Sequence, residues 1–178
     1  MQKLKNLLLE EHSKSQKDKI IHAISDGSIP LSDLIQIIKN NDETYAQRAA
    51  YVLSGIHDSS PDRLKPYLKE LWLCIKPTNH PAIPRAIYRY LASIDLPFDL
   101  EDGVFNQGCQ TFKNQKTPIA IKVHLMKILT NIALKYPELK EDVIYLIQEQ
   151  HPLSSPGYRA AAKKALINLS KSSIDKKE

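Results

Sequence analysis

The sequence predicts an all-α fold, a right-handed α-α superhelix of about ten helices in five antiparallel pairs. Three observations predict it. An apolar pattern recurs every 37 or 38 residues, a basic residue recurs in the same phase, and prolines stand at regular places between the helical segments. No strand pattern or glycine-rich loop accompanies them. Two helices within a repeat of this length are typical of solenoids, in which each repeat buries its apolar face against its neighbours.

The apolar and basic markers are independent of each other but keep the same period. The pattern Leu-x-x-Ile/Leu occurs at Leu53/Ile56, Leu91/Ile94, Leu129/Ile132 and Leu166/Leu169. Basic residues stand 37 positions apart at Arg48, Arg85, Lys122 and Arg159. Two markers in phase over four units predict four repeats.

The sequence pattern predicts two helices in each repeat. In 118–135, apolar residues recur at the spacing of a helix with one buried face: Ile121, Leu125, Ile128, Leu129 and Ile132. First helices are expected at 31–39, 61–76, 98–113 and 137–150, and second helices at 43–57, 81–94, 118–135 and 156–170. Prolines begin most of these helices. A backbone N–H in the first helical turn has no partner within the helix, so proline, which lacks an N–H, loses no hydrogen bond there. Thr117 and Ser155 are expected as N-caps, and Pro66 predicts a kink.

We expect one contiguous repeat domain over residues 1–171, followed by a polar tail at 172–178. The repeats are placed at 29–57, 58–95, 96–135 and 136–171, and residues 1–28 are expected to form a degenerate helix pair at the N-terminal end.

The repeats resemble HEAT repeats, of the armadillo-type α-solenoids, whose second helix typically carries Arg-Ala-Ala-x-x-Leu after a turn containing Asp. Asp42 followed by Arg48-Ala49-Ala50 fits that pattern, and Asn79 followed by Arg85-Ala86-Ile87 fits with Asn in place of Asp. Lys116 and Leu153 stand at this turn position in the next two repeats, so the acidic half of the pattern lapses there.

Over its whole length the chain is also similar to a group of small bacterial HEAT-repeat proteins. Four stretches carry this likeness: Glu11-His12-Ser13-Lys14, Gln47-Arg48-Ala49-Ala50, Ala120-Ile121-Lys122-Val123 and Tyr136-Pro137-Glu138-Leu139. The resemblance implies an architecture and no particular activity.

Composition narrows the function classes only a little. The net charge of +5 tolerates an anionic partner without requiring one. No apolar run approaches the ~20 residues that span a bilayer, so we expect a cytoplasmic protein without a membrane partner. Cys74 and Cys109 are expected to be reduced thiols. The six histidines form no metal-binding pair along the chain, and we expect no metal, cofactor or small-molecule substrate.

Charge is divided unequally between the predicted helices. The four second helices (44–57, 81–94, 118–135 and 156–171) carry ten Lys or Arg and no Asp or Glu, and the basic residues rise from one to four along the chain. The first helices carry seven basic and ten acidic residues. Second helices usually line the concave side of such stacks, so a basic binding face is predicted there.

The predicted partner-binding residues of this face are Arg85, Arg89, Lys122, Lys127, Arg159 and Lys163. Tyr88 and Tyr90 are expected to offer stacking surfaces beside the arginines. A structural interpretation competes with this one, because the resemblance implies a ladder between repeats built from Asp42, Arg48, Asn79 and Arg85. Lys122 also lies at the edge of the apolar stripe on a helical wheel.

The favoured hypothesis is a non-catalytic scaffold or adaptor whose concave face binds a protein segment. A nucleic-acid-binding solenoid is the alternative, resembling DNA-alkylation-repeat proteins in shape only. An enzyme ranks last. A glycosylase would need an aromatic cleft with a catalytic Asp, yet Trp72 is expected in the core and the second helices lack acids. A lyase of the adenylosuccinate type would need a Gly-Ser-Ser-x-Met-Pro loop, which is absent.

Overall fold

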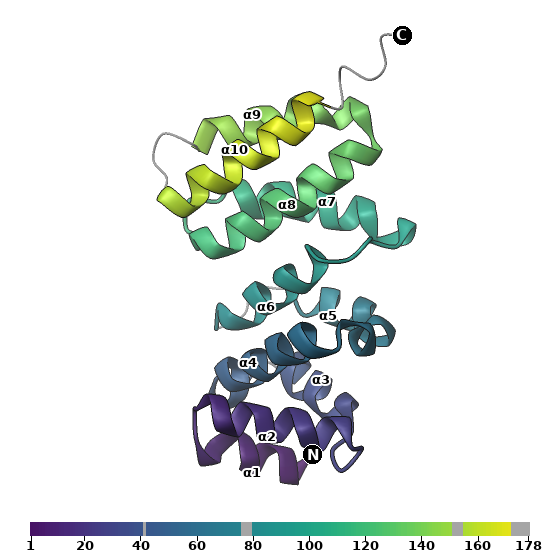
Figure 1. Ribbon diagram of the computed structural model, residues 1–178, viewed down its shortest axis with the longest axis vertical. Helices are drawn as coiled ribbons and strands as arrows, with labels where there is room; N and C mark the ends of the chain where they lie inside the picture. Colours follow the sequence, from purple (N-terminus) through teal and green to yellow (C-terminus); the bar gives the residue numbers. More distant parts are fainter. Residues whose placement is uncertain (41, 76–79, 151–154, 172–178) are drawn as a thin grey trace. The chain divides into compact units, whose positions relative to one another are not determined.

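The computed structural model describes residues 1–40, 42–75, 80–150 and 155–171. These ranges contain ten α-helices, two 3-10 segments and no strand, so the predicted all-α fold is confirmed (Figure 1). The chain divides into two compact units, residues 1–90 and residues 91–178. We describe each unit by itself.

The first unit contains six helices and one 3-10 segment: α1 (Gln2–Glu10), α2 (Lys14–Ser25), α3 (Leu31–Asn40), α4 (Glu43–Ser59), η1 (Pro61–Tyr67), α5 (Leu68–Leu73) and α6 (Ala82–Leu91), whose last residue falls at the division. Side chains cap two of these helices. Ser13 accepts a hydrogen bond from the Gln16 amide at 3.0 Å, and Asp42 accepts one from the Thr44 amide at 2.9 Å. Such caps satisfy backbone donors that have no partner within the helix.

The core of the first unit forms where α2 and α3 pack against α4. Ile20, Leu34 and Leu53 are fully buried in it, at 0–1 % exposure. Gly55 lies on the face of α4 toward α2, where a Cβ would stand 2.4 Å from Ile21 Cδ1. The missing side chain therefore permits the close approach of α2 and α4.

Pro66 interrupts the helix expected at 61–76. The structure has a 3-10 segment from Pro61 to Tyr67, followed by the short helix α5. A proline inside an α-helix removes a hydrogen bond and crowds the carbonyl four residues earlier. The tighter 3-10 winding replaces the predicted kinked α-helix, and Trp72 within α5 is half-buried rather than a core residue.

The second unit contains α7 (Phe98–Lys113), α8 (Ile119–Lys135), η2 (Pro137–Leu139), α9 (Lys140–Gln150) and α10 (Pro156–Lys171). Helix α8 packs against both α7 and α10 (Figure 1). The predicted apolar stripe of α8 is buried throughout, and Leu125 and Leu129 are completely inaccessible. Gly108 of α7 lies against this stripe, since a Cβ there would stand 3.3 Å from Leu129 Cδ2.

The two expected N-caps of this unit differ in outcome. Ser155 caps α10 as predicted, because its hydroxyl accepts a hydrogen bond from the Tyr158 amide at 3.3 Å. The prediction for Thr117 was wrong. Pro118 occupies the N-cap position of α8, and the Thr117 hydroxyl instead donates to the Thr111 carbonyl of α7 at 2.7 Å.

The division after Tyr90 falls inside the predicted repeat 58–95. The single contiguous domain and the right-handed superhelix therefore stay predictions, and the tail at 172–178 lies outside the described residues. Within the ranges that the structure covers, no helix is both long enough and apolar enough to cross a membrane.

Candidate functional site

The arginines of the first unit mostly contact the ends of earlier helices. Arg48 donates from Nη1 to the Leu8 carbonyl near the end of α1, at 2.5 Å. Arg63 donates from Nη2 to the Ile24 carbonyl near the end of α2, at 2.9 Å. The last carbonyls of a helix lack intrahelical donors and carry a partial negative charge, which a cation stabilises.

These contacts bear on the predicted ladder. Asp42 serves as the N-cap of α4, and Arg48 reaches the Leu8 carbonyl 40 residues earlier in the chain. Asn79 lies outside the described residues. The ladder of Asp42, Arg48, Asn79 and Arg85 stays a prediction.

Helix α6 carries the two predicted binding arginines of the first unit. Arg89 forms a bidentate ion pair with Asp58 at the end of α4, with distances of 2.6 and 3.3 Å. Arg85 is exposed and has no hydrogen bond or ion pair within the described part of the chain. The expected stacking role of Tyr88 and Tyr90 was wrong, because both rings are buried at 1 % and 0 % exposure. Burial also raises the pKa of Tyr90 to about 12.

Lys122 is built into the interior of the second unit. Only 6 % of the residue is exposed, its ammonium donates to Gln150 Oε1 of α9, and it lies 5.8 Å from the ring centre of Phe112 in α7. Desolvation lowers the pKa of this amine. Within the part of the chain that the structure describes, its partners are one neutral acceptor and one aromatic ring.

The other candidate residues of the second unit line different pockets. Lys127 lines a hollow beside the middle and end of α8. Arg159 and Lys163 line a shallow depression along α10. Lys122 lines a third pocket. No single pocket of the described residues contains all four, and their role as one binding face stays a prediction.

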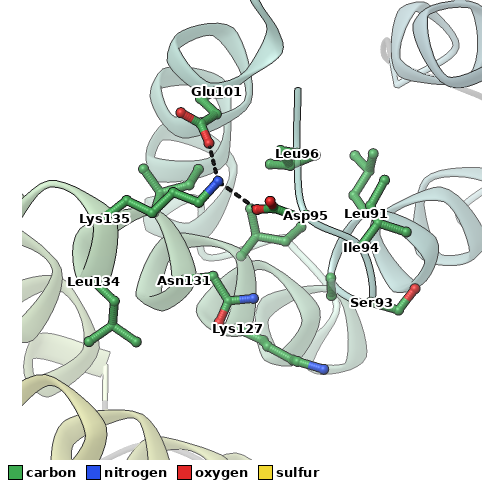
Figure 2. Close-up of a pocket in the computed structure, with 13 residues that line it drawn as sticks. Leu91, Ser93, Ile94, Asp95, Leu96, Glu101, Lys127, Asn131, Leu134 and Lys135 are labelled. Atoms are coloured by element: carbon green, nitrogen blue, oxygen red, sulfur yellow. Dashed lines mark hydrogen bonds and ion pairs between the residues drawn. The ribbon is translucent and has the colours of Figure 1, made fainter. Parts of the chain in front are cut away.

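The hollow at Lys127, which we call the α8 hollow, has a volume of about 350 Å³ and is the candidate binding site (Figure 2). Residues 91–96 of the α6–α7 connection form one side, Glu101 of α7 another, and the α8 segment 127–135 the third. Its wall mixes apolar side chains with charged and amide groups: Leu91, Ile94, Leu96, Ile128, Ile132, Asp95, Glu101, Lys127, Asn131 and Lys135. A mixed lining of this kind suits a ligand with both apolar and polar groups.

A network of three elements fixes one end of the hollow. The Lys135 ammonium donates to Asp95 at 2.5 Å and to Glu101 Oε1 at 2.7 Å, and the Tyr136 hydroxyl donates to Glu101 Oε2 at 2.6 Å (Figure 2 shows the two lysine contacts). Glu101 is only 5 % exposed. The hydrogen bonds from Lys135 and Tyr136 lower the pKa of Glu101. The hydrogen bonds to Asp95 and then to Glu101 raise the pKa of Lys135, and the hydrogen bond to Glu101 raises the pKa of Tyr136.

Lys127 and Asn131 remain available on the same wall. They stand one helical turn apart on α8, both are exposed, and neither forms a hydrogen bond or ion pair with the residues that the structure covers (Figure 2). The ammonium offers three donors, and the amide offers two donors and an acceptor. This pair could bind a carboxylate and a neighbouring peptide group at the same time.

The sequence alone did not identify the hollow. Glu101, Lys135 and Tyr136 were not singled out, although Glu101 precedes Lys135 by 34 residues, close to one repeat. That offset was the available signal. Asn131 was missed because charge alone was used to choose candidates on the second helices.

The helix bounds also refine the predicted charge asymmetry. Helix α4 includes Glu43 and Asp58, so the second helices of the first unit are not free of acids. In the second unit the asymmetry is complete, because α8 and α10 contain seven Lys or Arg and no Asp or Glu. Helices α7 and α9 contain six acids and two lysines. Over the described ranges, no group of three or more His, Cys, Asp or Glu could hold a metal ion.

Successive helix pairs, in-phase contacts reaching back about one repeat and a hollow along a second helix define a helical-repeat protein. The sequence profile of the HEAT repeat domain matches residues 4–169, and the chain belongs to that family. Comparisons with curated proteins and with solved structures gave no match.

Proposed function

We propose that this chain is a non-catalytic HEAT-repeat scaffold that binds an extended segment of a protein partner, and that the α8 hollow is the binding site. The observation that carries the proposal is the pair Lys127 and Asn131, which are exposed and lack partners in the described ranges beside a hollow with apolar walls. The membership in the HEAT repeat domain family supports a scaffold.

An extended segment fits the chemistry of this wall. Its backbone presents N–H and C=O groups that need partners when they leave water, and the Asn131 amide can serve as both donor and acceptor. Lys127 favours an acidic side chain in the segment, one or two residues from the peptide group that contacts Asn131. Apolar side chains of the segment would cover Ile94 and Leu134, the two half-buried apolar residues of the wall.

The pKa shifts at the hollow support binding rather than catalysis. A general acid or base must be free to exchange a proton with a substrate. Both carboxylate oxygens of Glu101 already accept hydrogen bonds, and Lys135 already bridges two carboxylates. These groups hold the wall in place and leave Lys127 and Asn131 to contact the partner.

Selection of peptides from a displayed random library tests the proposal. We expect wild-type protein to enrich segments that combine acidic and apolar residues. Lys127→Glu combined with Asn131→Ala should weaken a selected peptide at least tenfold, with little loss of stability because both residues are exposed. Arg85→Glu is the matched control, since it reverses an exposed, unpaired charge on α6 and should leave affinity within twofold. Equal weakening by both variants would contradict the site.

A polyanion is the second candidate because α8 and α10 carry no acid and expose Lys127, Lys163 and Lys164. Neutralised phosphates release counterions, so nucleic-acid binding would weaken steeply with salt. A mobility assay with duplex and single-stranded DNA between 50 and 200 mM salt separates the two candidates, as about a hundredfold or larger loss would indicate phosphate contacts. If the chain is a protein-binding scaffold, we expect its affinity for DNA to be weak and to change little with salt concentration.

A further inference from the structure

The pocket lined by Lys122 is the third described in the second unit. It has a volume of about 670 Å³ and lies where the end of α7, the start of α8, the end of α9 and the start of α10 meet. Gln150, whose side-chain oxygen accepts the hydrogen bond from Lys122, also lines this pocket. The charged end of Lys122 therefore lies at the pocket wall.

The ammonium of Lys122 has unused hydrogen-bonding capacity. It carries three N–H donors, yet among the described residues its contacts are one neutral amide oxygen and the face of Phe112. Buried charges in proteins are normally paired with an opposite charge, because the loss of hydration is otherwise uncompensated. Glu149 also lines the pocket, but it is exposed and forms no ion pair with Lys122. A buried cation without a carboxylate indicates a place for an anion from outside.

The rest of the lining shows what kind of anion fits. Lys113 adds a second positive charge, so among the described lining residues two lysines stand against one acid, Glu149. Ile119 and Tyr145 line the same pocket and are 45 % and 67 % exposed, so they offer apolar surface beside Lys122. A ligand with an apolar body would cover them while its anionic end reaches Lys122.

We propose that this pocket binds a carboxylate carried on an apolar body, with Lys122 as the residue that pairs with the carboxylate. The carboxylate of the ligand supplies the opposite charge that the buried ammonium lacks. It also accepts hydrogen bonds from the two N–H donors of Lys122 that Gln150 does not use. The carboxylate could come from a small organic acid or from the C-terminus of a peptide ending in an apolar residue. The pocket is separate from the α8 hollow, and neither site depends on the other.

Titrations followed by NMR at pH 7 test this site with two probes and their neutral amides. The small-acid probe is 3-phenylpropionate, with 3-phenylpropanamide as its control. The peptide probe is acetyl-Ala-Ala-Phe with a free C-terminal carboxylate, with the C-terminal amide as its control. We expect at least one acid to bind tenfold more tightly than its amide, with shifts at Ile119 and Tyr145. The acid that binds identifies the source of the carboxylate.

Lys122→Met keeps the length of the side chain and removes its charge. We expect it to lose the preference for acid over amide and to fold normally, since an unpaired buried charge is costly to keep. Lys113→Met removes an exposed charge from the same wall and should change the affinity less than threefold. Equal affinity for acid and amide, or an unchanged preference in Lys122→Met, would overturn the proposal, as would failure of both acids to bind at millimolar concentration. If Lys122→Met fails to fold, acid-specific shifts of wild-type protein decide, and shifts away from Ile119 and Tyr145 contradict the site.

Discussion

The exposed lysines of α8 and α10 differ from the arginines that join helices in the first unit. In the first unit, Arg48 and Arg63 donate to the carbonyls of earlier helices and Arg89 pairs with Asp58. In the second unit, Lys127, Lys163 and Lys164 are exposed and form no hydrogen bond or ion pair with the described residues. The first group ties helices together, whereas the second leaves its charge available to a partner.

This difference shows that a basic residue's place in the 37-residue period does not determine its structural or binding role. Arg48, Arg85 and Lys122 are in phase, yet Arg48 contacts a helix end, Arg85 is exposed and Lys122 is buried. A guanidinium can reach several carbonyls through its planar donors, whereas an ammonium is a compact charge on a flexible stem. The residues around each position decide whether its side chain joins helices or is available to a partner.

Core truncations should have the largest effect and show whether the two units unfold separately. Leu53→Ala in α4 and Leu129→Ala in α8 each remove a fully buried side chain, and each should cost about 2–5 kcal/mol. Hydrogen exchange should quicken mainly in residues 1–90 for the first variant and mainly in residues 91–171 for the second. Equal quickening over the whole chain in both variants would show one cooperative unit instead.

Glu101→Gln should destabilise the second unit by about 2–3 kcal/mol at pH 7, because it weakens two hydrogen bonds to a buried carboxylate. The pKa of Glu101 is lowered in the folded state. Its contribution is therefore complete above the unfolded pKa and is lost as the pH falls through the folded pKa. Urea unfolding from pH 7 to pH 3 should show the gap between wild type and variant closing below about pH 4.5.

The matched control for this change is Asp102→Asn, which removes an exposed charge on the same helix. It should change the free energy of unfolding by less than about 0.5 kcal/mol at any pH. A gap between wild type and Glu101→Gln that stays constant with pH would contradict the assigned role of the carboxylate.

Arg48→Met should cost about 1.5–3 kcal/mol, because the α1 carbonyl loses a charged donor. Arg85→Met changes the in-phase residue of the next repeat, which is exposed, and should stay within about 0.5 kcal/mol. Thermal and urea unfolding measure both. Similar losses would mean that the in-phase arginines share one structural role, as the ladder hypothesis predicts.

Arg89→Met should have the smallest measurable effect, about 0.2–1 kcal/mol, since its ion pair with Asp58 is partly exposed and screened. The loss should shrink in 1 M salt. Lys163→Met, on α10, should show no loss at either salt concentration. A salt-independent loss for Arg89→Met would point to packing of its aliphatic stem rather than to the ion pair.

The fold was largely predictable because each repeat follows the same local rules. The buried stripe of α8, the Ser155 cap and most helix limits follow from spacing and from single residues. The 3-10 segment around Pro66 was foreseen only as a kink, since sequence does not show how the chain relieves the missing hydrogen bond.

The binding features were less predictable because they depend on contacts between repeats. Lys127 was chosen for its charge, and the structure adds Asn131 and the hollow beside them. The burial of Lys122 depends on Gln150 and Phe112, which belong to other helices. The Lys135, Glu101 and Tyr136 network likewise joins residues about one repeat apart. The local sequence pattern therefore indicates which face of a helix is exposed, but it does not indicate which of the exposed side chains lack a hydrogen-bond partner.

Hydrogen–deuterium exchange of the protein with and without a library-selected peptide tests the central claim most directly. We expect slower exchange in residues 91–97 and 127–135, around the α8 hollow, and no change in α4 or in α6 before Leu91. Protection of α4 and the start of α6 with none at 91–97 and 127–135 would contradict it.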